Sequence, residues 1–155
     1  MTTAIIYATK YGTTEYVAQR IAQGLSEDTQ LFSIRDGVPS LDEYDTLVLG
    51  TAIYAGQPMK QMTKFIKSLD YSSKRVALFV CGMETNPDKR NQELVAAYPQ
   101  DLRNHATVSG FLGGQFQFSR MNRAERFIIH RIAQALEDSN QIDEAAIQEF
   151  ITALS

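Results

Sequence analysis

The chain has 155 residues, of which 44% are apolar, and this length suits one domain with a substantial hydrophobic core. Its 15 Lys and Arg residues nearly balance 18 Asp and Glu residues, so the net charge of −3 excludes the strongly basic composition typical of nucleic-acid binders. A single cysteine, Cys81, cannot form an internal disulfide, which favours a reduced, intracellular protein. We therefore expect one domain over residues 1–155 and no nucleic-acid partner.

The N-terminus carries no basic segment, and its apolar run is too short for a signal peptide. No other run approaches the roughly 18 apolar residues of a membrane-spanning helix. These observations predict a soluble, cytoplasmic protein and leave peripheral contact with a membrane surface open.

Short apolar runs without alternation recur along the chain, as expected of strands that are buried on both faces of a sheet. In chain order they are Ala4–Ala8, Leu31–Ile34, Thr46–Gly50, Arg75–Cys81 and Ala106–Leu112. Between and after them, apolar residues at helical spacing predict amphipathic helices. The helical sets are Val17, Ile21 and Leu25; Met62, Phe65, Ile66 and Leu69; Phe127, Ile128, Ile132 and Leu136; and a last helix that Asp143 caps.

This alternation of strands and helices predicts a doubly wound α/β fold with a five-stranded parallel sheet in the order 2-1-3-4-5. The connection before Thr46 is short, and whether it contains a helix stays open. Ligands of such sheets bind beyond the carboxyl ends of the strands, next to the point where the strand order reverses. The loops at 9–14, 51–58 and 82–90 are therefore the candidate site.

The first of these loops is Thr9-Lys10-Tyr11-Gly12-Thr13-Thr14, between a buried strand and a helix. Hydroxyl groups, a glycine and the exposed amides of a helix start are typical of a phosphate site that needs no metal. The alternative is that Thr13 or Thr14 only caps the helix and Gly12 only turns the chain.

The second loop contains Thr51–Gly56, whose small residues allow a planar ligand to approach, and Tyr54 is placed to stack on that ligand. We expect Pro58 to begin the next helix at its first turn. In the third loop, Gly82 and Met83 follow a strand, and a thioether packs well on an aromatic ring. The alternatives are an ordinary strand-to-helix loop and a surface turn.

Several other chemistries find no support in the sequence. Neither the Walker nucleotide motif nor the glycine-rich dinucleotide motif is present. A phosphatase of this architecture needs Arg six positions after Cys81, where Pro87 stands, so we interpret the cysteine as a buried strand residue. His105 and His130 have no second ligand at metal-binding spacing, and we expect no metal site.

The run Ala8–Glu15 resembles the phosphate signature of the flavodoxin family, small-[ST]-x-[TS]-G-x-[TS]-E, with Tyr11 in place of a hydroxyl residue. The resemblance implies a flavodoxin-like fold that binds FMN. It places the FMN phosphate on the hydroxyls of Thr9, Thr13 and Thr14 and on the amides of residues 10–14. It also assigns one flavin face to residues of the second loop and the other face to Gly82 and Met83. The second-loop residues are Thr51, Ala52, Ile53, Tyr54 and Ala55, and no catalytic residue is assigned, because the flavin carries the chemistry.

A closer resemblance is to the bacterial menaquinone-dependent protoporphyrinogen oxidase group of flavodoxin-like proteins. It rests on Gly50–Gly56, Asn86–Arg90 and Gly113–Arg120. The resemblance implies dehydrogenation of protoporphyrinogen IX, with electrons passed to a quinone or a similar acceptor. The alternatives are an electron carrier that exchanges electrons with redox proteins and has no substrate of its own, and an interaction module that has lost its cofactor.

The segment after the last strand is basic. Arg120, Arg123 and Arg126 are spaced to share one helical face, which suits the carboxylates of a porphyrinogen or an anionic lipid surface. The alternative is a solvated face that pairs with the acidic final helix.

Overall fold

Five strands whose residues are mostly apolar pair in parallel at the centre of the fold. In order across the sheet they are β2 (Thr29–Ser33), β1 (Thr3–Ala8), β3 (Thr46–Tyr54), β5 (Arg75–Cys81) and β6 (Val108–Phe111). The computed structural model describes residues 2–25, 28–54, 56–113, 115–116, 139–140 and 142–155. Counted along the chain, the five parallel strands have the order 2-1-3-4-5, so the predicted doubly wound α/β fold is confirmed.

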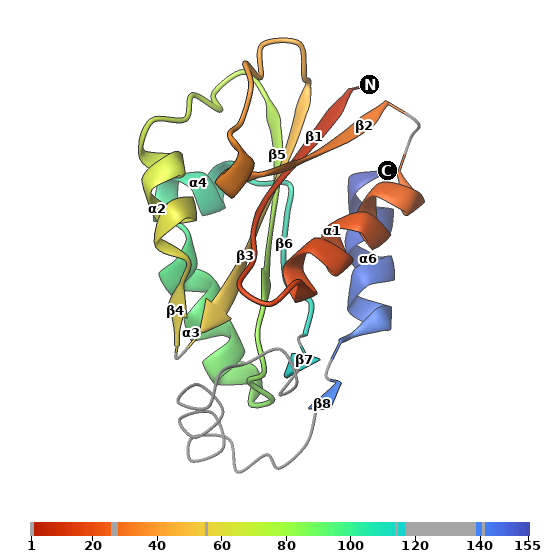
Figure 1. Cartoon of the computed structure of the whole chain (residues 1–155), viewed down its shortest axis with the longest axis vertical. Helices are drawn as coiled ribbons and strands as arrows, with labels where there is room; N and C mark the ends of the chain where they lie inside the picture. Colours follow the sequence, from red (N-terminus) through yellow and green to blue (C-terminus); the bar gives the residue numbers. More distant parts are fainter. Residues whose placement is uncertain (1, 26–27, 55, 114, 117–138, 141) are drawn as a thin grey trace.

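Helices cover both faces of this sheet (Figure 1). On one face lie α1 (Thr13–Gly24) and α6 (Glu144–Leu154), and on the other lie α2 (Lys60–Lys67), α3 (Pro87–Ala97) and α4 (Gln100–His105). Successive side chains of β1 alternate between the two cores, with Ile5 in the first and Ile6 in the second. Because both faces are covered, the strands are apolar at consecutive positions, as the sequence predicted.

Several predicted boundaries were wrong by a few residues. The second predicted strand includes Ile34, but β2 ends at Ser33 and a short 3₁₀ helix, η1 (Ile34–Asp36), fills the connection that the sequence left open. The connection between β5 and β6 contains two helices, α3 and α4, with Pro99 between them.

The helix predicted around Phe127 and Ile132 lies outside the described residues. Two further short strands, β7 (Gln115–Phe116) and β8 (Ser139–Asn140), pair antiparallel.

The prediction for Pro58 was also wrong. β3 continues to Tyr54, past the predicted end at Gly50, and turns back as β4 (Gln57–Pro58), where Pro58 pairs with Ile53. Proline lacks an amide proton, so a short edge strand tolerates it as well as a first helical turn does. Helix α2 consequently begins at Lys60, after Met59.

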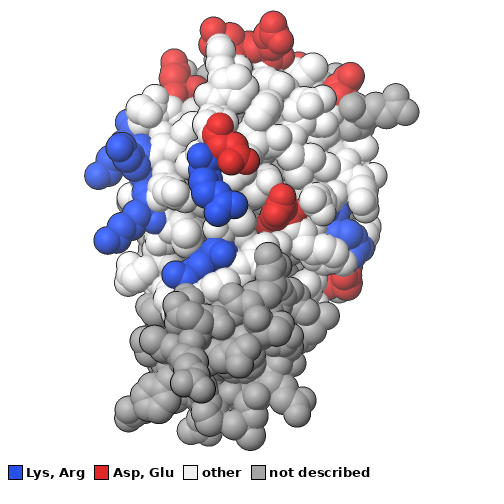
Figure 2. Space-filling model, viewed as in Figure 1, with Lys and Arg blue, Asp and Glu red and all other residues white. Residues whose placement is uncertain are grey.

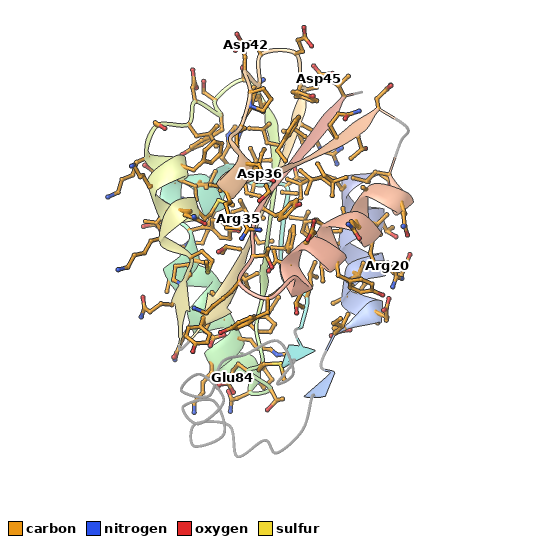
Figure 3. The ribbon with its side chains drawn as sticks, in the orientation of Figure 1. Arg20, Arg35, Asp36, Asp42, Asp45 and Glu84 are labelled. Atoms are coloured by element: carbon orange, nitrogen blue, oxygen red, sulfur yellow. The ribbon has the colours of Figure 1, made fainter. Side chains whose placement is uncertain are left out.

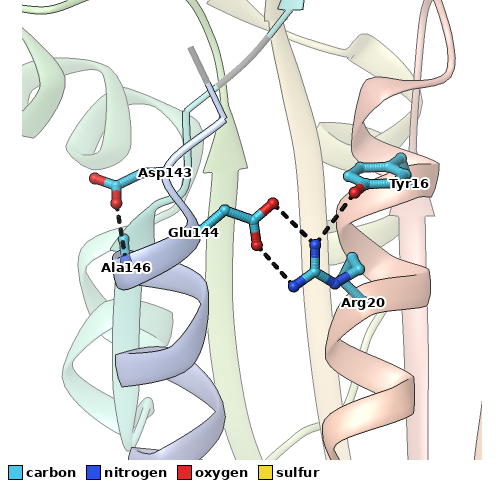
Figure 4. Close-up of polar contacts among 5 residues, drawn as sticks. All are labelled: Tyr16, Arg20, Asp143, Glu144 and Ala146. Atoms are coloured by element: carbon cyan, nitrogen blue, oxygen red, sulfur yellow. Dashed lines mark hydrogen bonds and ion pairs between the residues drawn. The ribbon is translucent and has the colours of Figure 1, made fainter. Parts of the chain in front are cut away.

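Side chains fix the starts of two helices. Asn86 accepts hydrogen bonds from the amides of Asp88 and Lys89, so α3 begins inside the segment that was predicted as loop 82–90. The Asp143 carboxylate accepts a 2.9 Å hydrogen bond from the Ala146 amide (Figure 4), which confirms the predicted cap of the last helix.

An ion pair connects the two helices of one face. Arg20 on α1 binds the Glu144 carboxylate on α6 at 2.7 Å, and it also donates to the Tyr16 hydroxyl at 3.1 Å (Figure 4). Exposed pairs of this kind contribute at most about 1 kcal/mol. The apolar packing of α1 and α6 on the sheet therefore dominates their attachment.

Gly50 in β3 lies against the ring of Phe79 in β5, which leaves no room for a side chain at position 50. A Cβ at Gly50 would lie 2.0 Å from the nearest atom of that ring, which is far inside van der Waals contact. We expect Gly50→Ala to lower the free energy of unfolding by about 1–3 kcal/mol or more, as overpacked core sites do. Urea unfolding measures this loss.

A double variant separates overpacking from a loss of glycine flexibility. Phe79→Leu removes the clashing ring edge, so G50A/F79L should lose less stability than the sum of the two single variants. An unfolding midpoint of G50A equal to that of the parent protein would contradict the packing described for Gly50.

Candidate functional site

The loop after β1 is a tight turn that connects this strand to α1. The Gly12 amide donates to Thr9 Oγ1 at 3.0 Å, and Gly12 has a positive φ of 95°. Gly12 itself occupies the N-cap position of α1 and provides no side-chain cap. Thr13 and Thr14 therefore do not act as the N-cap, which removes the simple capping alternative for them.

The hydroxyl of Thr14 is buried under this turn without a hydrogen bond. The residue is fully buried, and Oγ1 has no oxygen or nitrogen partner among the described residues; its polar neighbour is the Cys81 thiol, a weak hydrogen-bonding group. Buried polar groups in native proteins are almost always paired, so an unpaired hydroxyl at a helix N-terminus favours a site completed by a bound acceptor.

Cys81, at the end of β5, lies beside Thr14. Burial raises the pKa of the Cys81 thiol to about 12, and the neighbouring Thr14 hydroxyl only partly offsets this effect. The thiol is therefore protonated at neutral pH, which confirms the interpretation of Cys81 as a buried strand residue.

Glu15, in the first turn of α1, binds a buried tyrosine of β1. The Tyr7 hydroxyl donates to Glu15 Oε1 at 3.0 Å, and burial together with this hydrogen bond raises the pKa of Tyr7 to about 12. The Glu15 carboxylate, which is the acidic position of the phosphate signature, is thus held by a side chain of β1.

The first and second loops meet through aromatic rings. Lys10 Nζ lies 4.3 Å from the centroid of the Tyr54 ring and 5.6 Å from that of Tyr11. The two rings contact edge to face, with centroids 6.2 Å apart. The Tyr11 hydroxyl is buried and has no hydrogen-bond partner in the described part of the chain. Tyr11, which departs from the hydroxyl residue of the signature, therefore supports the Tyr54 ring from the side.

The second loop is a hairpin that the side chain of Thr51 holds. Thr51 Oγ1 accepts a 3.1 Å hydrogen bond from the Met59 amide and donates to the Ala52 carbonyl. Thr51 is fully buried, so its side chain shapes the loop from within. Ala52 still pairs with Cys81 of β5, Ile53 and Tyr54 extend further and pair with β4, and Ala55 lies outside the described residues.

The third loop packs against the second. A Cβ at Gly82 would lie 3.2 Å from Cβ of Ile53, and the Gly82 amide donates to the Gly113 carbonyl at 2.9 Å. Met83, the next residue, is half-buried. Gly82 and Met83 are thus brought to the edge of the sheet that holds Ile53, as the sequence predicted.

Glu84 and Arg90 fix the rest of this loop. The Glu84 carboxylate accepts from the amides of Thr85 and Asn86 at 3.1 and 3.0 Å, and Arg90 donates to the Glu84 carbonyl. The Arg90 guanidinium lies 4.6 Å from the centroid of the Phe111 ring. Figure 3 labels Glu84 at the end of the molecule where these loops gather. The segment Asn86–Arg90 therefore has a structural role in holding the loop.

Glu93 is a residue that sequence reasoning missed. Its Oε2 is buried without a hydrogen-bond partner among the described residues and would lie 3.6 Å from a Cβ at Gly82. Burial of the carboxyl group, and next the charge of Glu84, raise the pKa of Glu93 above its usual value, while Arg90 lowers it. Nothing in the helical pattern around Glu93 distinguishes it from an exposed acid.

The structure thus brings the three predicted loops together at the carboxyl edge of the sheet. Arg120, Arg123 and Arg126, the predicted substrate or partner residues, lie outside the described residues. Within the part of the chain that is described, no helix is long and apolar enough to cross a membrane. The same part contains no group of three or more His, Cys, Asp or Glu side chains suited to a metal ion.

A doubly wound parallel sheet with a hydroxyl-rich turn and an aromatic ring at its switch point defines the flavodoxin-like class of α/β proteins. The sequence model of the Flavodoxin domain matches residues 4–143, and the chain belongs to this family. A search of curated protein sequences found no match.

Solved structures share this fold at low sequence identity. Oxidised Flavodoxin 1 from Bacillus cereus is 17% identical with a TM-score of 0.58, over 98% of this chain and 93% of that one. A Fusobacterium nucleatum flavodoxin bound to flavin mononucleotide is 15% identical with a TM-score of 0.56, over 99% and 96% of the two chains. A Lactobacillus acidophilus flavoprotein in complex with FMN is 16% identical with a TM-score of 0.52, over 73% and 92%.

The buried carboxyl group of Glu93 makes stability depend on pH. Its pKa is raised in the folded state, so the stability that the protonated carboxyl group contributes is complete at acidic pH and is lost as the pH rises through the folded-state pKa. Glu93→Gln removes this titration, and we expect it to raise the melting temperature near pH 8 but much less near pH 4. Thermal unfolding across that range measures the difference.

Glu43→Gln is the matched control, because Glu43 is exposed and neutralising it changes the net charge equally. It should leave the melting temperature nearly unchanged at both pH values. A pH-independent effect of E93Q would show that the amide alters packing rather than proton binding.

Proposed function

We propose that this chain binds FMN at the carboxyl edge of its sheet and transfers electrons through it. The observation that carries the proposal is the buried, unpaired hydroxyl of Thr14 beside the N-terminus of α1. A phosphate oxygen is an acceptor for that hydroxyl, and helix amides favour a negative charge at the same place.

The residues of the turn fit a phosphate group. Thr9 Oγ1 already accepts from the Gly12 amide, which leaves its own proton to donate. Thr13, a half-buried residue, adds a further hydroxyl at the start of α1, next to Thr14 in the chain. Amides of residues 10–14 would complete the binding of the FMN phosphate, as the resemblance to flavodoxins implies.

The second and third loops fit the flavin ring. Tyr54 presents a flat ring that Tyr11 supports edge-on, and aromatic stacking contributes about 0.5–1.5 kcal/mol beyond buried area. Ala52 and Ile53 would offer backbone groups to the same face, with Gly82 and Met83 at the other face. Bound FMN would supply the electron chemistry, so the protein needs to bind, orient and shield it.

Family membership supports electron transfer over substrate chemistry. Redox proteins that donate or accept electrons are the partners that this proposal requires.

Thr14→Val tests the proposal, because it keeps the shape of the residue and removes only the hydroxyl. Without ligand, the variant should be about as stable as the parent protein, since the lost hydroxyl has only the weakly hydrogen-bonding Cys81 thiol beside it. Its affinity for FMN should fall roughly ten- to a hundredfold, because a hydrogen bond to a charged group contributes about 1.5–3 kcal/mol. Quenching of flavin fluorescence during titration measures the affinity.

Thr14→Ser restores the hydroxyl and should recover most of the affinity. Parent protein that fails to bind FMN below about 100 μM would overturn the proposal, since a dedicated site reaches lower dissociation constants. Equal affinity of T14V and T14S would remove Thr14 from the phosphate site while leaving FMN binding intact.

Dehydrogenation of protoporphyrinogen IX is the second candidate function. It is supported by the resemblance of Gly50–Gly56 and Asn86–Arg90 to the protoporphyrinogen oxidase group, with the basic segment around Arg123 and Arg126 as the substrate-binding candidate. In that reaction the porphyrinogen is oxidised stepwise, and successive quinone molecules accept its hydrogen atoms and become quinols.

Anaerobic incubation with protoporphyrinogen IX and menadione distinguishes the two candidates. A dehydrogenase should release fluorescent protoporphyrin in proportion to bound FMN, and Arg123→Glu with Arg126→Glu should slow it without loss of FMN. A rate no higher than that of free FMN with menadione would leave the electron carrier as the function.

A further inference from the structure

Helix α2 carries a stripe of lysines on its exposed side. Lys60, Lys64 and Lys67 follow one another at helical spacing, all three are exposed, and the helix contains no acidic residue. We call these three residues the lysine stripe. At 1.5 Å per residue, it extends about 10 Å along the helix.

The three ammonium groups are not used within the described structure. None of them forms an ion pair or hydrogen bond with a residue that the structure describes. They border a groove of about 340 Å³ together with Gln57, Pro58 and Thr63. The apolar residues of α2, Met62 and Ile66, point into the core, so the face of the helix along the groove is polar and cationic.

The lysine stripe begins beside the candidate FMN site. Gln57, which lines the groove, pairs with Tyr54 in the hairpin of β3 and β4. Lys10 lies over the ring of the same Tyr54. The N-terminus of α2, which has no side-chain cap, adds the positive end of a helix dipole next to Lys60. Positive charge therefore extends from the Tyr54 ring along the groove.

The exposed side of α2 carries no acidic side chain of its own. In Figure 2, basic side chains gather along the side on which Figure 1 shows α2, whereas acidic ones lie mainly at the upper end, with others in the middle and at the lower right of this face. Figure 3 labels Asp42 and Asp45 at the upper end and Glu84 at the opposite end, where the candidate site lies. A net charge of −3 thus conceals a basic side of the molecule along α2.

We propose that the lysine stripe and its groove dock the acidic surface of a redox-partner protein, which places the partner next to the Tyr54 edge of the FMN site. This inference rests on the proposed function, since it identifies the kind of protein that exchanges electrons there. Complementary charge of this kind accelerates and orients association.

A protein fits the lysine stripe better than a membrane or a nucleic acid does. Peripheral membrane helices insert apolar side chains beside their lysines, but the described part of α2 exposes no large apolar residue. Nucleic-acid sites favour arginine and a basic domain, whereas the stripe is all lysine on an acidic chain. An acidic protein needs only several point contacts along about 10 Å.

A matched pair of charge variants tests the proposal. Lys64→Glu reverses the centre of the stripe, and the double variant Gln19→Glu with Gln23→Glu makes the same change of net charge at two exposed positions of α1, on the opposite face of the sheet. The probe is a plant-type [2Fe–2S] ferredoxin, an acidic one-electron carrier, and a biosensor measures its binding to the chain with and without FMN. Since steering accelerates association by roughly 10- to 1,000-fold in total, K64E should slow association about threefold to tenfold at low salt.

Q19E/Q23E should leave the association rate within a factor of about two, and salt should erase the difference between the variants. Equal effects of K64E and Q19E/Q23E, or no complex with ferredoxin at low salt, would overturn the docking surface. Stripe-dependent binding to phosphatidylglycerol vesicles or to duplex DNA, without ferredoxin binding, would overturn the choice of a protein partner. Failure of FMN titration with intact ferredoxin binding would instead count against the proposed function alone.

Discussion

Parallel pairing of β1, β3 and β5 is the constraint on which the rest of this molecule depends. Parallel neighbours cannot be joined by tight turns, so each connection crosses a face of the sheet, and the helices must bury both faces. Tyr98, which follows α3, illustrates how fully one face is buried. Its hydroxyl is buried against the sheet and lies within hydrogen-bond distance of the carbonyls of Leu49 in β3 and Phe79 in β5, at 3.0 and 2.7 Å. All three carboxyl ends consequently lie at one edge, where their loops contact one another.

At that edge the requirements of stability and of binding diverge. In the core, polar groups are paired, as the hydroxyl of Tyr98 is. Near the three loops, the hydroxyls of Tyr11 in the first loop and Thr14 in the first turn of α1, and one oxygen of Glu93 in α3, are buried without a partner in the described part of the chain. Each such group costs about 1–3 kcal/mol. Their presence in and beside the loops at the carboxyl edge of the sheet is what a preorganised binding site requires, because a ligand that pairs with them recovers that cost.

The sequence was most informative where one physical rule determines the outcome. Strands buried on both faces must be apolar at consecutive positions, so β1 and β5 were visible directly. The carboxyl-edge rule then located the three loops without any contact being known. Asp143 was predictable as a cap because an acidic residue directly before an apolar helical pattern satisfies the free amides locally.

Other features depend on contacts that no local pattern contains. Pro58 fits a helix start and an edge strand equally well, and only its pairing with Ile53 decides between them. Glu93 resembles any helical acid until Gly82 covers one of its oxygens. Thr51 resembles a ligand-binding hydroxyl until the hairpin supplies the Met59 amide as its partner.

Balanced composition likewise conceals the basic side of the molecule. The fold decides that the lysines of α2 are exposed along a groove shared with Gln57, the partner of Tyr54 in the hairpin, while Asp42 and Asp45 occupy the upper end of the molecule. A negatively charged partner surface would be drawn toward the lysines and away from the acidic end, so the fold that assembles the loops also orients the approach to them.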